Sequence, residues 1–218
     1  MKIAVLGTGM VGHALATRCA GLGHTVMMGA RVRDNVHAAR WAQTHESQSG
    51  TFADAAAFGD LVVFATLGSA TLEAAALAGA KALAGKVVLD VSNPLDFSNG
   101  FPPSLLSEHA NTTSAGEALQ AALPQSRVVK ALNTMNCDVM VDPTRIPGDH
   151  DVFLCGNDTD AKTDVTTLLS QFGWAAPIDL GPIEASRGLE GLMLFWLRLY
   201  GVIGHTDFNY NIVVAPAA

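Results

Sequence analysis

The segment GTGMVG at residues 7–12 constrains the fold of this 218-residue chain more than any other feature. Residues 3–6 are apolar and predict a buried strand at 2–6, whereas residues 10–22 carry apolar side chains at helical spacing. The segment therefore reads as a GxGxxG turn between a strand and a helix, and residues 25–28 supply the second strand of a βαβ unit. This context predicts a turn that binds the phosphates of a dinucleotide.

Each glycine of such a turn has its own physical task. The first makes the tight turn, the second lets the backbone approach a pyrophosphate, and the third lets helix and strand pack closely. The N-terminus of the helix adds free N–H groups and the positive end of the helix dipole. We expect the phosphates to be bound by Gly7, Thr8, Gly9, Met10, Val11 and Gly12.

Strand and helix patterns alternate along the rest of the chain. Further strands are predicted at residues 61–65, 87–91, 128–132, 151–155 and 176–180, with a short edge strand at 51–52. Helices are predicted at residues 35–44, 69–84, 114–124, 158–172 and 186–200, and a long loop at 95–113. The alternation predicts an α/β fold of the Rossmann type, with a doubly wound, mainly parallel sheet and a small C-terminal helical portion. We expect residues 1–136 to form the dinucleotide-binding domain and residues 137–218 to form an extension, with two further strands and helices, that packs on it.

The residues after the second strand distinguish between the two common dinucleotides. Sites for NAD usually place an acidic residue there to bind the ribose 2′-hydroxyl. Here the first charged residue is Arg31, with Arg33 close behind, and a guanidinium group suits a 2′-phosphate. Asp34 follows and is expected to cap the next helix, while Arg33 could equally be an ordinary surface residue. The sequence favours NADP over NAD.

Ligands of such sheets lie at the carboxyl ends of the strands. We expect the ribose and the nicotinamide to be held there, although an Asn-Pro pair is also a common turn without a ligand. The candidates are Thr66, Leu67, Asn93, Pro94, Asn133 and Met135.

No catalytic or metal-binding constellation is evident among the histidines and cysteines, and the odd number of cysteines disfavours a disulfide framework. Lys130 lies in a predicted strand and could act as an acid, but we expect it to pair with a carboxylate instead. A net charge of −7 disfavours nucleic acid as a partner. The apolar run after Met1 is too short for a signal peptide, and Arg198 interrupts the most apolar later stretch. We expect a cytoplasmic protein without a membrane segment.

Several blocks taken together resemble the NADPH:coenzyme F420 oxidoreductase family. Besides the glycine turn and the GAR segment after the second strand, they are DVSNPLD (90–96), VVKALNTMNCDVM (128–140), DVFLCGND (151–158) and IDLGPIEASRGLEGL (178–192). The resemblance implies a Rossmann domain, a small C-terminal portion and a homodimer. It also implies direct hydride transfer between a nicotinamide and a stacked deazaflavin, with the loop at 132–137 forming one wall of the cleft. On this resemblance Ala30, Arg31 and Arg33 hold the 2′-phosphate.

The residues themselves leave the hydride acceptor open between coenzyme F420 and a flavin, FMN or FAD. A β-hydroxyacid or imine reductase shares the N-terminal unit but usually adds a long all-helical domain, for which residues 133–218 leave little room. A third reading is an NADP(H)-binding sensor without turnover, which the shortage of catalytic side chains also suits. The apolar helix at 186–200 is expected to serve as core or as dimer interface.

Overall fold

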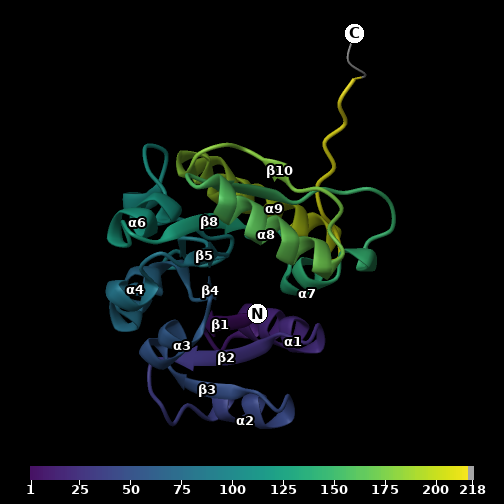
Figure 1. Cartoon of the computed structure of the whole chain (residues 1–218). Coiled ribbons are helices and arrows are strands. Elements are labelled where there is room, and N and C mark those ends of the chain that lie inside the picture. Colours follow the sequence, from purple (N-terminus) through teal and green to yellow (C-terminus); the bar gives the residue numbers. More distant parts are fainter. Residues whose placement is uncertain (216–218) are drawn as a thin grey trace.

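The computed structural model describes residues 1–215 and shows one eight-stranded sheet between two layers of helices (Figure 1). The strand order is β10-β9-β8-β5-β4-β1-β2-β3. The strands are β1 (Lys2–Leu6), β2 (Thr25–Ala30), β3 (Gln48–Thr51), β4 (Leu61–Phe64), β5 (Val87–Asp90), β8 (Arg127–Ala131), β9 (Phe153–Gly156) and β10 (Ile178–Asp179). The pairs from β3 to β8 are parallel, whereas β9 runs antiparallel to β8 and parallel to β10. This arrangement confirms the doubly wound, mainly parallel α/β fold.

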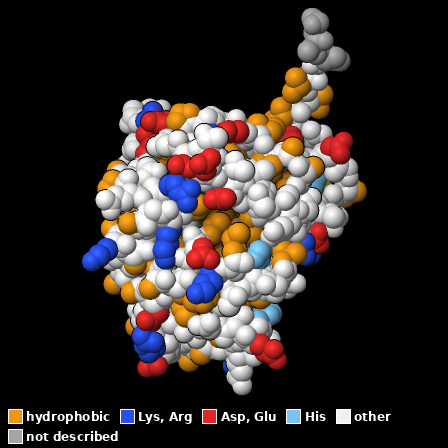
Figure 2. Space-filling view, viewed as in Figure 1, with side chains coloured by type: hydrophobic (Ala, Val, Ile, Leu, Met, Phe, Trp, Pro, Cys, Tyr) orange, Lys and Arg blue, Asp and Glu red, His pale blue; other side chains and the backbone are white. Residues whose placement is uncertain are grey.

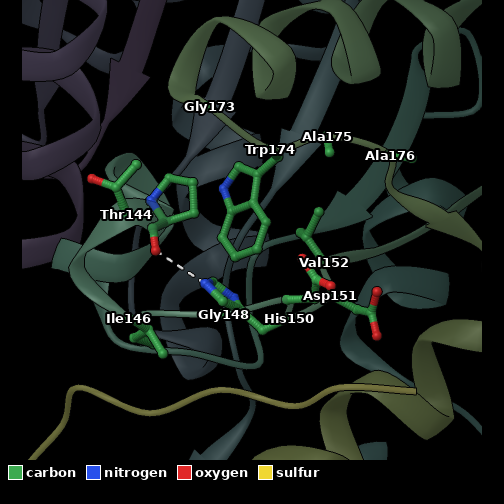
Figure 3. A pocket seen from close by; sticks show the side chains of 12 residues that line it. Thr144, Ile146, Gly148, His150, Asp151, Val152, Gly173, Trp174, Ala175 and Ala176 are labelled. Carbon is green, nitrogen blue, oxygen red and sulfur yellow. Dashed lines mark hydrogen bonds between the residues drawn. The ribbon is translucent and has the colours of Figure 1, made fainter. Parts of the chain in front are cut away.

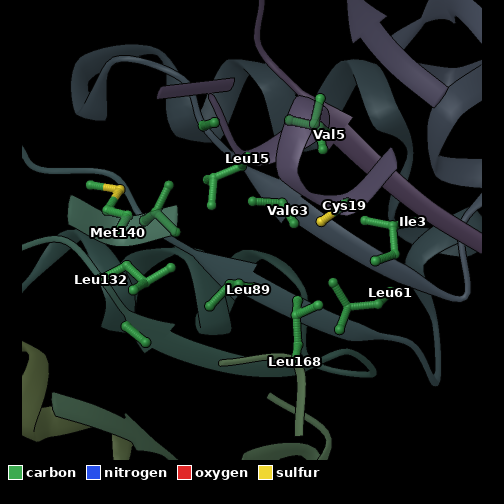
Figure 4. Packing of buried hydrophobic residues seen from close by; sticks show 14 of the residues in the cluster. Ile3, Val5, Leu15, Cys19, Leu61, Val63, Leu89, Leu132, Met140 and Leu168 are labelled. Carbon is green, nitrogen blue, oxygen red and sulfur yellow. The ribbon is translucent and has the colours of Figure 1, made fainter. Parts of the chain in front are cut away.

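The helices separate into two sets that cover opposite faces of the sheet. The helices are α1 (Met10–Gly21), α2 (Val36–Thr44), α3 (Phe52–Phe58), α4 (Thr71–Ala78), α5 (Ala80–Leu83), α6 (Ala115–Ala122), α7 (Cys137–Val141), α8 (Thr159–Phe172) and α9 (Ser186–Ile203). Because side chains alternate along a strand, Ile3 and Val5 enter one apolar core with α1, α2, α7 and α8 (Figure 4). Ala4 and Leu6 enter the other core with α3, α4, α5, α6 and α9. Both faces of the sheet are therefore buried, as the continuous apolar runs predict.

Three local predictions differ from the structure. The short edge strand is β3, which ends at Thr51, because Thr51 and Asp54 form a capping box that starts α3 at Phe52. The single helix expected at 69–84 begins with a 3₁₀ turn at Gly68–Ala70, and Gly79, with a φ of +86°, then separates α4 from α5. The region 95–113 is mostly loop, but it contains a short antiparallel hairpin of β6 (Leu95–Asp96) and β7 (Ser104–Leu105).

The segment that follows α9 is attached to the body at several points, one of which is Asp151. The backbone N–H of Asp151 donates to the Tyr210 carbonyl at 2.8 Å, and the Asp151 carboxylate accepts from the Ile212 N–H at 2.6 Å. Beyond that attachment the chain leaves the body, and its apolar side chains are visible along the projecting segment in Figure 2. No helix within residues 1–215 is long and apolar enough to cross a membrane.

Candidate functional site

The chain reverses its direction across the sheet between β1 and β4. The strands β2 and β3 follow β1 on one side, and β4 then returns to its other side. The crevice outside the carboxyl ends of two such strands is where ligands of doubly wound sheets bind. The glycine turn and the loop after β4 meet at this point, which makes it the candidate site.

The backbone of the glycine turn is tightly packed at two of its three glycines. Gly7 has a φ of +131°, and a Cβ there would collide with the carbonyl oxygen of Ala65 after β4. A Cβ at Gly12 would collide with the carbonyl oxygen of Gly7. These two residues are thus required by the turn and by the close packing of α1 against it, as the motif predicts.

Gly9 is different because it faces open space. A Cβ at Gly9 would meet no atom within 4 Å, and Gly9 is the N-cap of α1 without any side-chain capping bond. The first turn of α1 holds no acidic residue, so the positive end of its dipole is uncompensated. Thr8, Met10 and Val11 surround this open N-terminus, and Met10 is exposed. An uncapped helix end with free space beside it fits a pyrophosphate group.

The arginines after β2 lie on the surface and are paired with carboxylates from two helices. Arg31 Nη2 lies 3.4 Å from Glu73 Oε2 on α4, and Arg33 Nη2 lies 2.8 Å from Asp54 Oδ2 on α3. Ala30, the last residue of β2, is buried beneath them. Both guanidinium groups therefore stand at the carboxyl end of β2, where the 2′-phosphate of a dinucleotide is expected.

The helix that follows these arginines is capped by a different residue from the one predicted. The side chain of Asn35 accepts hydrogen bonds from the backbone of His37 at 3.1 Å and of Ala38 at 3.0 Å. Asp34 is exposed and is not the cap. The prediction was wrong by one residue because Asp and Asn have nearly equal N-cap preference, so adjacent candidates cannot be ranked from sequence.

The loops after β4 and β5 lie against each other. A Cβ at Gly68 would collide with the backbone of Asn93 and Pro94, so the two loops are in direct contact. In the β4 loop, the Thr66 hydroxyl lies 3.1 Å from that of Thr71, and Leu67 is exposed. The structure thus brings four of the predicted ribose and nicotinamide residues together at the carboxyl edge of the sheet.

A reciprocal pair of amides joins the ends of β5 and β8. Asn93 Nδ2 donates to the Asn133 carbonyl at 2.7 Å, and Asn133 Nδ2 donates to Asn93 Oδ1 at 2.8 Å and to the Leu189 carbonyl at 3.1 Å. Within residues 1–215, Asn133 Oδ1 and Thr134 Oγ1 are buried and lack a hydrogen-bond partner. A buried acceptor without a partner costs about 1–3 kcal/mol, which a ligand supplying a donor would offset.

The backbone just before Asn133 is strained. Leu132 has a φ of +66°, in the left-handed region that L side chains rarely adopt. Such a residue costs about 1–3 kcal/mol and is typical of functional sites. Met135, two residues beyond Asn133, is buried in the core on the α1 side of the sheet. Met135 therefore contributes to the core rather than to an exposed surface of the candidate site.

Lys130 is buried in a network that links α9 to the sheet. Its Nζ lies 2.7 Å from Asp90 Oδ2 and 2.9 Å from Glu190 Oε1, and all three side chains are 0% exposed. Burial by itself would lower the pKa of Lys130, but the two carboxylates outweigh it and raise that pKa. Glu190 also accepts from the backbone N–H groups of Ala115 and Gly116 at 2.9 and 3.0 Å, at the N-terminus of α6. The predicted pairing of Lys130 is confirmed, and the group is sealed from solvent.

Glu190 and Glu73 are the two relevant residues that the sequence did not identify. Glu190 is a lone acid within an otherwise apolar helix, which is a usable signal for a buried ion pair. Glu73 carries no such signal because it lies on an exposed helix surface. Its meeting with Arg31 depends entirely on the packing of α4 beside the end of β2.

Two open cavities lie outside this edge within residues 1–215, one of about 640 Å³ beside α6 and one of about 400 Å³ in the C-terminal part, which Figure 3 shows. A histidine lies in the wall of the smaller one. Its wall includes Trp174 and His150, whose rings meet edge to face at 5.1 Å. His150 Nε2 lies 3.0 Å from the Pro143 carbonyl, and Nδ1 lies 3.0 Å from Asn209 Nδ2. Both ring nitrogens already have partners, so we assign this cavity no role in the site.

Thiols and metal ligands are not gathered in the described part of the chain. Within residues 1–215, no group of three or more His, Cys, Asp or Glu residues could hold a metal ion. Cys19, Cys137 and Cys155 are free thiols, and burial raises the pKa of Cys19 and of Cys155 to about 12. Partial burial and the neighbouring Asp138 also raise the pKa of Cys137, so no thiol has the lowered pKa of an activated nucleophile.

The chain is similar over most of its length to proteins with assigned activities. The family described as NADP oxidoreductase, coenzyme F420-dependent, matches residues 2–94. The F420-dependent NADP reductase of Methanocaldococcus jannaschii is 33% identical over 202 residues, which cover 88% of this chain and 89% of that protein. Metalloreductase STEAP3 of Rattus norvegicus is 28% identical over 194 residues, covering 88% of this chain and 36% of the rat protein.

A solved structure matches almost completely. The crystal structure from Arthrobacter sp. FB24, of a protein assigned as an F420-dependent NADP-reductase, is 47% identical and has a TM-score of 0.93. The match covers 98% of this chain and 100% of that one. The similarity therefore extends through the C-terminal part as well as the glycine turn.

Proposed function

Because the chain belongs to the coenzyme F420-dependent NADP oxidoreductase family, we propose that it transfers a hydride between NADP(H) and coenzyme F420. The observation that carries this proposal is the uncapped N-terminus of α1 at Gly9, with Arg31 and Arg33 at the end of the neighbouring strand. That arrangement suits a pyrophosphate and a 2′-phosphate together, which only NADP(H) carries among the common dinucleotides.

The binding roles follow from position along the carboxyl edge of the sheet. The turn at residues 7–12 would hold the pyrophosphate, and Ala30, Arg31 and Arg33 would hold the 2′-phosphate. The loops after β4, β5 and β8 would hold the ribose and the nicotinamide. In this assignment the residues are Thr66, Leu67, Asn93, Pro94, Asn133 and Met135, with Met135 supporting the loop from the core side.

The protein's own contribution is positioning rather than proton transfer. When bound, NADP(H) and F420 supply the hydride donor and the acceptor, and we propose that their rings stack directly on each other. Lys130 cannot act as an acid, because its ammonium group is buried in ion pairs with Asp90 and Glu190. The Asn93–Asn133 hydrogen bonds and the strained backbone of Leu132 would hold the loops after β5 and β8 in the position that binds the nicotinamide.

We also propose a division of the chain and an assembly. Residues 1–136 would form the dinucleotide-binding domain, and the extension from 137 onward would pack on it, which the pairing of β9 with β8 supports. The protein would act as a cytoplasmic homodimer. Free thiols suit a reducing compartment, and exposed apolar residues on α9 and the following segment, including Phe195, Val202 and Val213, suit a subunit interface.

The test is oxidation of NADPH by the purified protein with coenzyme F420, FMN and FAD offered separately, and NADH as the control donor. We expect turnover with F420 and NADPH, and rates at least tenfold lower with either flavin or with NADH. Turnover with a flavin but not with F420 would show that the acceptor is a flavin. Tight NADPH binding without turnover on any acceptor would indicate a sensor.

A further inference from the structure

The two arginines at the end of β2 are held by carboxylates that are anchored very differently. The Asp54 carboxylate, which pairs with Arg33, also accepts from the backbone N–H and the hydroxyl of Thr51 at 2.8 and 2.6 Å. The hydrogen bonds from Thr51 lower the pKa of Asp54, with a smaller contribution from Arg33. Asp54 is thus fixed by the capping box of α3 and keeps Arg33 in one place.

Glu73 has no such anchor. Its Oε2 lies 3.4 Å from Arg31 Nη2, and the two side chains are 58% and 60% exposed. Arg31 is the only side-chain partner of the Glu73 carboxylate within residues 1–215. Exposed pairs of this kind are weak, so the carboxylate can swing away at little cost.

Glu73 is placed where it can compete with a dinucleotide for Arg31. α4 follows the loop after β4, so Glu73 reaches Arg31 across the edge where the adenosine half of a dinucleotide would lie. A carboxylate on Arg31 stands where a 2′-phosphate must bind, and the two anions compete for one guanidinium group. A dinucleotide with a free 2′-hydroxyl makes no such demand on Arg31.

We propose that Glu73 is a specificity-determining residue that weakens binding of NADP(H) by occupying Arg31 in the free protein. This inference rests on the proposed function, because it requires the 2′-phosphate to bind at Arg31. On binding, Arg31 transfers from Glu73 to the phosphate, while Arg33 remains positioned by Asp54. Glu73 therefore reduces the preference for NADP(H) and speeds its release.

The test is a set of binding constants for four nucleotides, measured by calorimetry on the parent protein and on E73Q, R31Q, the double variant and D164N. The nucleotides are NADPH, NADH, 2′,5′-ADP and 5′-AMP, so that the 2′-phosphate is the only difference within each pair. D164N is the matched control, because Asp164 is an exposed residue of α8 and its change alters the net charge by the same amount.

We expect E73Q to bind NADPH and 2′,5′-ADP about two- to fivefold more tightly, as loss of one weak exposed ion pair implies. Binding of NADH and 5′-AMP should be unchanged, D164N should match the parent, and the gain should vanish in the R31Q background. An E73Q variant that binds 2′,5′-ADP no more tightly, or that gains equally for 5′-AMP, would overturn the inference alone. A parent protein that binds NADPH no better than NADH would overturn the proposed NADP site and this inference together.

Discussion

At the scale of single residues, the glycines of the α1 turn serve the fold and the ligand separately. Gly7 and Gly12 are needed by the fold, because any side chain there would collide with backbone oxygens. Gly9 has a φ of −79° and open space at its Cβ position, so the folded chain without ligand has no need of glycine there. Its requirement comes from the pyrophosphate that the proposed function places beside it.

We therefore predict that G9A folds normally and loses dinucleotide. Its melting temperature should lie within about 2 °C of the parent, since exchanging Gly for Ala at a compatible φ is neutral or slightly stabilising. Its affinity for NADPH should fall at least tenfold, because the methyl group occupies the space through which the phosphate approaches. Calorimetric melting and NADPH titration check the two halves of the prediction.

The matched variant is G12A, which places the same methyl group where there is no room. It should lose about 1–3 kcal/mol of unfolding free energy from overpacking. Equal stability losses in G9A and G12A would show that Gly9 is required by the fold instead.

At the scale of elements, the buried ion network determines where α9 and α6 sit on the sheet. Lys130 on β8 joins Asp90 on β5 to Glu190 on α9, and Glu190 also holds the N-terminus of α6. Leu189, adjacent to Glu190, accepts the amide of Asn133 in the candidate site. The network thus couples the position of α9 to the loop after β8.

Removal of the buried Lys130 ammonium group should strongly destabilise the fold. K130M leaves two buried carboxylates without a cation, and we predict a loss of about 3–5 kcal/mol in unfolding free energy, measured by urea denaturation. The triple variant K130M/D90L/E190L should recover much of that loss, because it leaves no buried charge unpaired. A loss below about 1 kcal/mol in the unfolding free energy of K130M would mean that the network contributes little to the stability of the fold.

The sequence predicted the elements well where the signal is local. The glycine turn, the apolar strands and the run of arginines after β2 are each read from neighbouring residues, and the structure confirms the doubly wound sheet. Local signals also decided the placement of Arg31 at the end of β2, although its use for a phosphate stays a prediction. The split of the helix at Gly79 was missed because an isolated glycine is tolerated within many helices.

The contacts between segments that are distant in the sequence could not be predicted from the sequence. The Lys130–Glu190 pair spans α9 and β8, the Asn93–Asn133 pair spans two loops, and the Arg31–Glu73 pair depends on helix packing. The left-handed backbone at Leu132 is likewise imposed by its surroundings, because leucine has no local preference for it. These tertiary features are the ones that shape the candidate site.

At the scale of the whole molecule, the two buried thiols predict how stability responds to alkaline pH. Burial raises the pKa of Cys19 and Cys155 from the ordinary 9.0 to about 12. The unfolded chain therefore loses thiol protons near pH 9 that the folded chain retains, so the free energy of unfolding should fall as pH rises from 9 toward 12. Below pH 8 the two thiols should have no effect on its pH dependence.

Urea denaturation at pH 7, 9 and 10 checks this, with the C19A/C155A variant as the comparison. The variant is less stable at neutral pH because it loses buried volume, but its stability should fall less steeply between pH 9 and 10. Identical slopes for the variant and the parent would show that the thiols do not ionise differently in the two states.

We propose direct hydride transfer from NADPH to coenzyme F420 in a site that positions the two rings and moves no proton of its own. The most direct measurement uses NADPH carrying deuterium at the nicotinamide C4, prepared in each of its two configurations, with mass analysis of the reduced F420. We predict that one configuration delivers its deuterium completely to F420 and the other delivers none. Reduced F420 without label from both configurations, or no reduction of F420 at all, would contradict the account.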